Sequence, residues 1–131
     1  MSRENFDALI LVQDIMSKAI ISVNTETTVF QIAKMMEQSG IGAILVKKNN
    51  NLVGIITDRD FATKIASNSL SFDTPVEKVM SSPLITINHN ESISAAAKRM
   101  TSKKIWKLAV TDNGDIVGLI TSTDLVTQLT K

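Results

Sequence analysis

Apolar and polar positions follow one pattern that occurs twice along the chain. Short β-prone runs at 20–23 and 84–87 are each followed by a stretch with apolar residues at i, i+3, i+4 and i+7. That spacing predicts an amphipathic helix in each copy. Thr28 and Gln31 have the spacing of a capping box, and Gly40 suits a helix end. The two apolar stripes consist of Val29, Ile32, Ala33 and Met36, and of Ile93, Ala96, Ala97 and Met100.

Each helical stretch is followed by two apolar runs joined by a polar turn. These runs predict strands, one pair near 43–46 and 52–56 and the other near 108–110 and 116–120. A last helix is expected after Thr57 and after Thr121. Short helical turns are expected at 12–16 and at 76–80, ahead of the first strand of each copy. The predicted fold is α+β, with the order β-α-β-β-α used twice.

The two copies align without a gap. Val12 falls on Val76 and Phe61 falls on Leu125, an offset of 64 positions. One copy alone has too few elements to bury its apolar faces, so we expect two to close on each other with pseudo-twofold symmetry. The predicted organisation is an N-terminal segment 1–11, a first repeat 12–70 and a second repeat 71–131, with a polar linker between them.

Composition narrows the class of protein. The chain has 131 residues, 44% of them hydrophobic, and a formal net charge of +1, which gives no general attraction to nucleic acid or membranes. The absence of cysteine excludes disulfides and thiolate metal sites, and a single histidine cannot supply a His-based centre to both copies. No apolar run approaches the roughly 20 residues of a membrane span. We expect a soluble cytoplasmic protein with no metal centre.

Both copies end in Gly-x-x-Thr-x-x-Asp, at 54–60 and at 118–124. Thr and Asp at this spacing, where a strand turns into a helix, form a capping box, and capping alone accounts for both residue types. The same turn also suits a nucleotide, because a helix start binds phosphate and a carboxylate accepts both hydroxyls of a ribose. Recurrence of the motif while its neighbours differ favours the second interpretation.

With these features the repeat resembles the CBS domain, whose tandem pair is called a Bateman module. The resemblance rests on the two motifs, on apolar runs at 41–46 and 105–110, and on Met-Ser pairs at 16–17 and 80–81. It covers nearly the whole chain. It implies a non-catalytic regulatory module that binds AMP, ADP, ATP or S-adenosylmethionine in clefts between the repeats. It also implies a homodimer of such pairs and an effector protein reached in trans or through self-association.

The resemblance also assigns residues. The Asp of the motif typically holds the ribose in this family, and the Thr contacts ribose or phosphate, which points to Asp60, Asp124, Thr57 and Thr121. The base is expected against the first strand and the start of the second, although most of the aliphatic residues there also fit an ordinary core. These residues are Ile21, Ser22, Val23, Gly42 and Ala43 in the first copy, and Ile85, Thr86, Ile87, Trp106 and Lys107 in the second.

The two ligand sites are expected to differ. Arg59 in the first motif suits a bidentate phosphate contact, and Thr123 takes its place in the second. Gly42 leaves room where the second copy has Trp106, which fits either stacking on a base or ordinary packing. Lys107 is the candidate phosphate contact of the second copy. We therefore expect different occupancy or ligand preference.

Two other function classes compete with this hypothesis. A nucleic-acid-binding protein is disfavoured by the near-neutral charge, while a purely structural protein–protein interaction module stays open. An enzyme is not expected, because the chain shows no nucleophile–base pair and no P-loop, and His89 fits a surface or capping role. Phe6–Leu11, ahead of the first repeat, is a candidate contact with a second copy of the chain.

Overall fold

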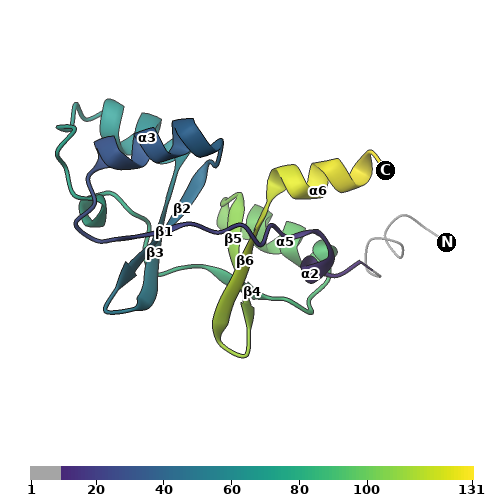
Figure 1. Cartoon of the computed structure of the whole chain (residues 1–131). Helices are drawn as coiled ribbons and strands as arrows, with labels where there is room; N and C mark the ends of the chain where they lie inside the picture. Colours follow the sequence, from purple (N-terminus) through teal and green to yellow (C-terminus); the bar gives the residue numbers. More distant parts are fainter. Residues whose placement is uncertain (1–9) are drawn as a thin grey trace. The chain divides into compact units, whose positions relative to one another are not determined.

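A computed structural model describes residues 10–131 (Figure 1). These residues form two compact units. The central unit is Ile21–Leu84, and the terminal unit combines the chain up to Ile20 with Ile85–Lys131. Most of segment 6–11, for which contact with a second copy is expected, lies outside the described residues.

The central unit is a three-stranded sheet with helices. Its sheet order is β1-β2-β3, with β1 parallel to β2 and β2 antiparallel to β3. The last helix begins with one α-helical turn and continues as a π-helix, in which hydrogen bonds span five residues instead of four. The elements are β1 (Ser22–Asn24), α3 (Val29–Ser39), β2 (Ala43–Lys48), β3 (Asn51–Thr57), α4 (Asp58–Asp60), the π-helix η1 (Phe61–Ala66) and the 3₁₀-helix η2 (Val76–Lys78).

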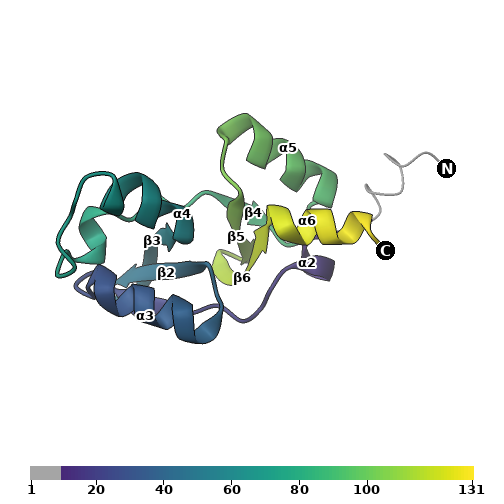
Figure 2. The same cartoon turned by 90° about the horizontal axis from the view of Figure 1, so that it is seen from above.

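The terminal unit repeats this topology. Its sheet order is β4-β5-β6, again with one parallel and one antiparallel pair. Two of its helices, α5 and α6, lie side by side (Figure 2). The elements are α2 (Val12–Ile15), β4 (Thr86–Asn88), α5 (Ile93–Lys103), β5 (Lys107–Asp112), β6 (Asp115–Thr121) and α6 (Ser122–Leu129). The predicted α+β class and β-α-β-β-α order are confirmed in both units.

Side chains define where the two long helices begin. Thr28 Oγ1 accepts from the Gln31 N–H at 3.2 Å, and Gln31 Oε1 accepts from the Thr28 N–H at 2.9 Å, so the predicted capping box is confirmed. Ser92 Oγ accepts from the Ala95 N–H at 3.1 Å at the start of α5. Both helices end in a left-handed residue, which is Gly40 in one unit and Lys104 in the other.

Each unit has its own apolar core between its sheet and its helices. In the central unit Ile32 of α3 packs on Ile44 and Ile56 of the sheet. In the terminal unit Met100 of α5 packs on Leu108 and Ile120. All of these side chains are almost inaccessible to water, as their apolar spacing in the sequence predicts.

The compact units are offset from the sequence repeats. Val12, at the start of the first repeat, is fully buried in the core of the terminal unit, and its N–H donates to the Glu91 carbonyl at 2.8 Å. Val76, at the start of the second repeat, is fully buried in the core of the central unit, and its N–H donates to the Thr27 carbonyl at 2.8 Å. The short helical turn that begins each repeat therefore completes the unit holding the other repeat's sheet.

The recurring glycine and the recurring Met-Ser pair are packing partners. Ser81 pairs with Ile55 through two backbone hydrogen bonds of 2.8 and 3.0 Å, which brings Met80 against Gly54. A Cβ at Gly54 would lie 2.6 Å from the Met80 sulfur. In the terminal unit Ser17 pairs with Leu119, and Met16 packs in the same way on Gly118. Close approach of this segment accounts for the glycine in each motif.

Within residues 10–131, no helix combines the length and apolar character needed to cross a membrane.

Candidate functional site

In the central unit, the eight predicted residues of the first copy lie at or near one end of the sheet, with Ser22 and Val23 set back opposite Leu45 and Val46 of β2. The start of β1, the start of β2 and the end of β3 share this end, because β1 and β2 are parallel and β3 runs the other way. Ala43 is the register partner of Thr57, and the Asp58 N–H donates to the Gly42 carbonyl at 3.0 Å. The Leu45 N–H donates to the Ile21 carbonyl at 2.9 Å. We call this end the central corner.

The terminal unit builds a matching corner, which we call the terminal corner. Lys107 is the register partner of Thr121. The Ser122 N–H donates to the Trp106 carbonyl at 2.9 Å, and the Ala109 N–H donates to the Ile85 carbonyl at 3.2 Å. The predicted residues of the second copy are thus brought together by the same backbone pattern.

Burial separates the predicted residues into two groups. Val23, Ala43 and Ile87 are buried, so their side chains serve the cores. Ser22 and Thr86 project on the exposed face of their strands. Trp106 is 42% exposed and is therefore accessible for stacking. Ile21 and Ile85 are partly buried and pack against the cores.

In the terminal corner, Thr121 and Asp124 form a reciprocal capping box. The Thr121 N–H donates to Asp124 Oδ2 at 2.9 Å, and the Asp124 N–H donates to Thr121 Oγ1 at 3.1 Å. The capping interpretation is confirmed here. Capping uses one carboxylate oxygen, and a carboxylate has about four acceptor positions. Asp124 therefore retains acceptor capacity while it caps α6.

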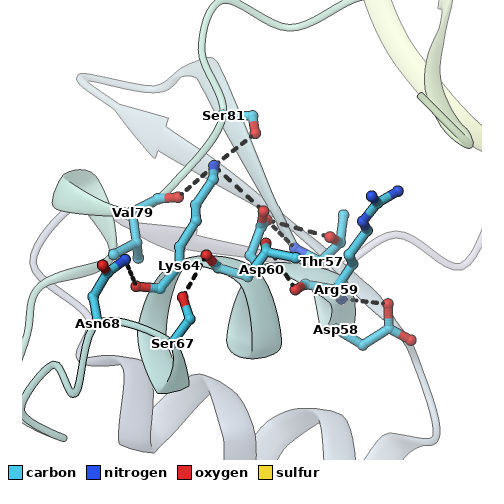
Figure 3. A network of polar contacts seen from close by, with 10 residues as sticks. Thr57, Asp58, Arg59, Asp60, Lys64, Ser67, Asn68, Val79 and Ser81 are labelled. Atoms are coloured by element: carbon cyan, nitrogen blue, oxygen red, sulfur yellow. Dashed lines mark hydrogen bonds and ion pairs between the residues drawn. The ribbon is translucent and has the colours of Figure 1, made fainter. Parts of the chain in front are cut away.

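The central corner surrounds its carboxylate more tightly. Asp60 is only 7% exposed. Asp60 Oδ2 accepts from both the N–H and the hydroxyl of Thr57, at 2.8 and 3.2 Å. Its second oxygen, Oδ1, lies 3.3 Å from the ammonium of Lys64 (Figure 3). Burial of a carboxylate requires such partners, because an unpaired charge is strongly disfavoured away from water.

Lys64 was not among the residues that the sequence pointed to. Its ammonium also donates to the Val79 carbonyl at 3.0 Å and to Ser81 Oγ at 3.1 Å, so its three contacts match its three N–H groups (Figure 3). Alignment of the two repeats does show that this position differs between them, because Gln128 stands at the position equivalent to Lys64. Lys64 thereby joins the motif to the Met-Ser segment within the central unit.

Arg59 and Thr123 are both exposed. The Arg59 N–H donates to Asp58 Oδ1 at 2.9 Å. The guanidinium group points away from the Asp60–Lys64 pair (Figure 3). Its position leaves the charge of Arg59 available to a phosphate outside that pair.

Arg99, like Lys64, is a residue of the candidate site that the sequence did not point to, and it contacts the backbone of Thr86. Arg99 donates to the Thr86 carbonyl at 3.0 Å and to both carboxylate oxygens of Glu91 at 3.1 and 3.2 Å. Burial raises the pKa of Glu91, but the Asn88 N–H and the Arg99 guanidinium outweigh it, so this pKa lies below its ordinary value. The first copy has Met35 at the position of Arg99.

A surface hollow of about 390 Å³ lies elsewhere in the central unit. It is lined by Leu70, Ser71, Asp73, Thr74, Pro75 and Lys78, none of which is a predicted ligand contact. We assign more weight to the corners, because they recur in both units and carry the motif.

Known proteins are similar to this chain in sequence and fold. The family model of the CBS domain matches residues 12–67 and 76–131. CBS domain-containing protein YhcV of Bacillus subtilis (strain 168) is 33% identical over 114 residues, which are 87% of this chain and 81% of YhcV. Several other curated relatives are longer, and the chain spans between 19% and 62% of their length.

Two solved structures extend the comparison. An uncharacterized conserved protein from Pyrococcus horikoshii has a TM-score of 0.90 and 27% identity, over 95% of this chain and 96% of that one. The CBS domain pair of protein MJ0100, in complex with 5′-methylthioadenosine and S-adenosyl-L-methionine, has a TM-score of 0.81 and 29% identity, over 92% and 95%. The two matched repeats and these neighbours show that the chain belongs to the CBS-domain family and contains a pair of CBS domains.

Proposed function

We propose that this CBS domain pair is a non-catalytic regulatory module whose two corners bind adenosine-type ligands. The observation that carries the proposal is the recurrence of one arrangement in both units. Each corner places a motif aspartate, Asp60 or Asp124, at the sheet end that also holds an exposed strand hydroxyl, Ser22 or Thr86. The MJ0100 pair, with its two adenosyl compounds, supports the ligand class.

Each group has a chemical task in this proposal. The carboxylates of Asp60 and Asp124 accept hydrogen bonds from the ribose hydroxyls. Arg59 and Lys107 supply positive charge for the phosphates of AMP, ADP or ATP. The strand residues around Ser22 and Thr86 contact the base. A ligand without phosphate, such as S-adenosylmethionine, would use the carboxylate and strand contacts alone.

Regulation follows if the ligand favours one of two conformations. A ligand shifts such an equilibrium only by the difference between its affinities for the two states. We propose that the favoured state is read by an effector protein in trans or by a second copy of the chain. A purely structural interaction module remains the competing function, and it requires no ligand.

Calorimetric titration and thermal unfolding test the proposal. The panel consists of adenosine, AMP, ATP, 5′-methylthioadenosine and S-adenosylmethionine, with guanosine and GMP as comparison ligands. A ligand at 100 times its Kd stabilises the native state by about 2.7 kcal/mol, which raises the unfolding temperature. We expect adenosine compounds to bind more tightly than their guanine counterparts.

Substitution of the two aspartates locates the binding. Asp60→Asn and Asp124→Asn keep the side-chain shape and one capping oxygen but remove the charge, and each should weaken binding at its own corner by about 10- to 100-fold. Asp115→Asn is the matched control, since Asp115 is exposed at the start of β6, the end of that strand remote from Thr121. Unchanged binding in both motif variants would refute the site assignment, and absence of binding by the whole panel would favour the structural module.

A further inference from the structure

We propose that Lys64 competes with the ligand ribose for Asp60 and thereby makes the central corner the weaker of the two. This inference rests on the proposed function, because it concerns the same carboxylate. It adds a specificity-determining residue that is present in one repeat and absent from the other. Lys64 and Gln128 occupy equivalent positions at the repeat offset.

The acceptor positions of Asp60 are nearly full. Thr57 provides two donors to Oδ2, at 2.8 and 3.2 Å, and Lys64 lies 3.3 Å from Oδ1. A carboxylate has about four acceptor positions, so about one is left. The two vicinal hydroxyls of a ribose would donate two hydrogen bonds. A complete ribose contact at Asp60 therefore requires Lys64 to withdraw.

The terminal corner has no such competition. Within the described part of the chain, the Asp124 carboxylate accepts one hydrogen bond, from the Thr121 N–H at 2.9 Å. Adding both ribose hydroxyls brings the total to three, which a carboxylate accommodates. Gln128 carries no charge that could form an ion pair with Asp124.

Withdrawal of Lys64 is feasible without disruption of the unit. Its side chain is 39% exposed, so water can replace the carboxylate as a partner. Its contacts with the Val79 carbonyl and Ser81 Oγ, at 3.0 and 3.1 Å, can persist. The energy lost is that of a partly exposed ion pair, and we expect the resulting loss of affinity to be on the order of 5-fold.

Adenosine is the appropriate probe, because it has the ribose hydroxyls and no phosphate that Lys64 would attract. In the background of Asp124→Asn, which weakens the terminal corner, Lys64→Gln should tighten adenosine binding about 5-fold by calorimetry. Lys64→Met, which keeps the aliphatic stem, should also tighten it. In the background of Asp60→Asn, the reciprocal change Gln128→Lys should weaken binding at the terminal corner by a similar factor.

The control ligand is 2′,3′-dideoxyadenosine, which lacks both hydroxyls and should bind all Lys64 variants alike. Circular dichroism without ligand identifies any variant that fails to fold, and the Gln128→Lys arm then decides alone. Unchanged or weaker adenosine binding in folded Lys64→Gln, or unchanged binding in Gln128→Lys, overturns the role of Lys64 while the proposed function stands. Absence of adenosine binding in every protein, the unsubstituted chain included, overturns both.

Discussion

Asp60 and Asp124 hold equivalent positions in the two repeats, yet their carboxylates have different partners. Asp60 is buried and contacts the partly exposed Thr57 and Lys64, whereas Asp124 is partly exposed and caps α6 through Thr121. Two contacts make the difference: the Thr57 hydroxyl donates to Asp60 whereas the Thr121 hydroxyl accepts from the Asp124 N–H, and Lys64 stands where the second repeat has Gln128. A motif shared by two repeats therefore does not make two equal sites, because the residues around it decide how many acceptor positions stay open.

The motif glycines give the first prediction at this scale. Gly118→Ala should lower the free energy of unfolding by about 1–3 kcal/mol, since its Cβ would lie 2.6 Å from the Ser17 carbonyl oxygen. Gly54→Ala should cost less, because its nearest contact is the flexible Met80 side chain and the Ser81 carbonyl oxygen lies farther away, at 3.0 Å. Gly42→Ala is the control, as a Cβ there meets only the tip of the exposed Asp58 side chain. Urea unfolding measures all three, and an equal effect at Gly42 and Gly118 would contradict the packing argument.

The lowered pKa of Glu91 gives a prediction with a definite sign. When folding lowers the pKa of a carboxyl group, the ionised group stabilises the protein at every pH above the ordinary pKa of 4.5. This contribution is lost as the pH falls through the lowered pKa of the folded state. Glu91→Gln should therefore destabilise the protein at pH 7 by up to about 1 kcal/mol, the scale of a partly exposed ion pair. The difference in the free energy of unfolding between Glu91→Gln and the unsubstituted protein should become smaller below pH 4.5.

Unfolding measured between pH 3 and pH 7 checks this prediction. The control is Glu26→Gln, because Glu26 is exposed in the turn after β1. A difference between Glu91→Gln and the unsubstituted protein that stays constant across this pH range would mean that Glu91 acts through packing instead of charge.

At the scale of elements, the two long helices end at equivalent positions with different residues. Gly40 and Lys104 both have left-handed backbone, with φ of 72° and 54°. Because a side chain disfavours this conformation, Lys104→Gly should raise the free energy of unfolding by about 0.5–1 kcal/mol. Lys103→Gly, one position earlier within α5, should lower it by about 1 kcal/mol. Chemical unfolding of both variants tests the cap, and two changes of the same sign would refute it.

The sequence predicted the helices and strands well where the pattern is local. The stripe from Val29 to Met36 located α3, and the apolar runs located both hairpins within a few residues. The π-helix Phe61–Ala66 could not be predicted in this way. Its equivalent in the other unit, α6, is α-helical throughout, so local spacing does not distinguish the two. Tertiary contacts of each helix must select the hydrogen-bond register.

For the candidate site, the repeat and the family resemblance indicated which residues would gather at each sheet end. They did not reveal the Lys64 contacts. Val79 and Ser81 lie 15 and 17 positions from Lys64, beyond the reach of any helical spacing rule. Only the path of the Met-Ser segment across β3 brings them together. The sequence shows that Lys64 is replaced by Gln128 in the second repeat, but it does not show that Lys64 forms an ion pair with Asp60.

At the scale of the whole molecule, each compact unit contains the short helical segment that begins the other sequence repeat. The central unit is continuous along the chain, whereas the terminal unit joins the residues up to Ile20 to those after Leu84. Sequence alignment cannot reveal this exchange, because Val12 and Val76 occupy the same place in their repeats. Which sheet each segment covers is a property of the path of the chain.

This exchange predicts where a substitution is felt. Val12→Ala removes two methyl groups from a fully buried position and should destabilise the terminal unit by about 2 kcal/mol. Hydrogen exchange of the full chain should then show faster exchange at Leu108, Val110 and Ile120, although the substitution lies in the first sequence repeat. Amides of β2 in the central unit should be affected less.

Val76→Ala is the matched experiment, since Val76 is buried to the same extent in the central unit. It should accelerate exchange in β2 and β3 while amides of β5 and β6 retain more of their protection. Each variant should therefore accelerate exchange in the unit that holds the sheet of the other sequence repeat. Equal loss of protection in both units would show that the two unfold as one cooperative block, and loss confined to the substituted residue's own repeat would contradict the exchanged packing.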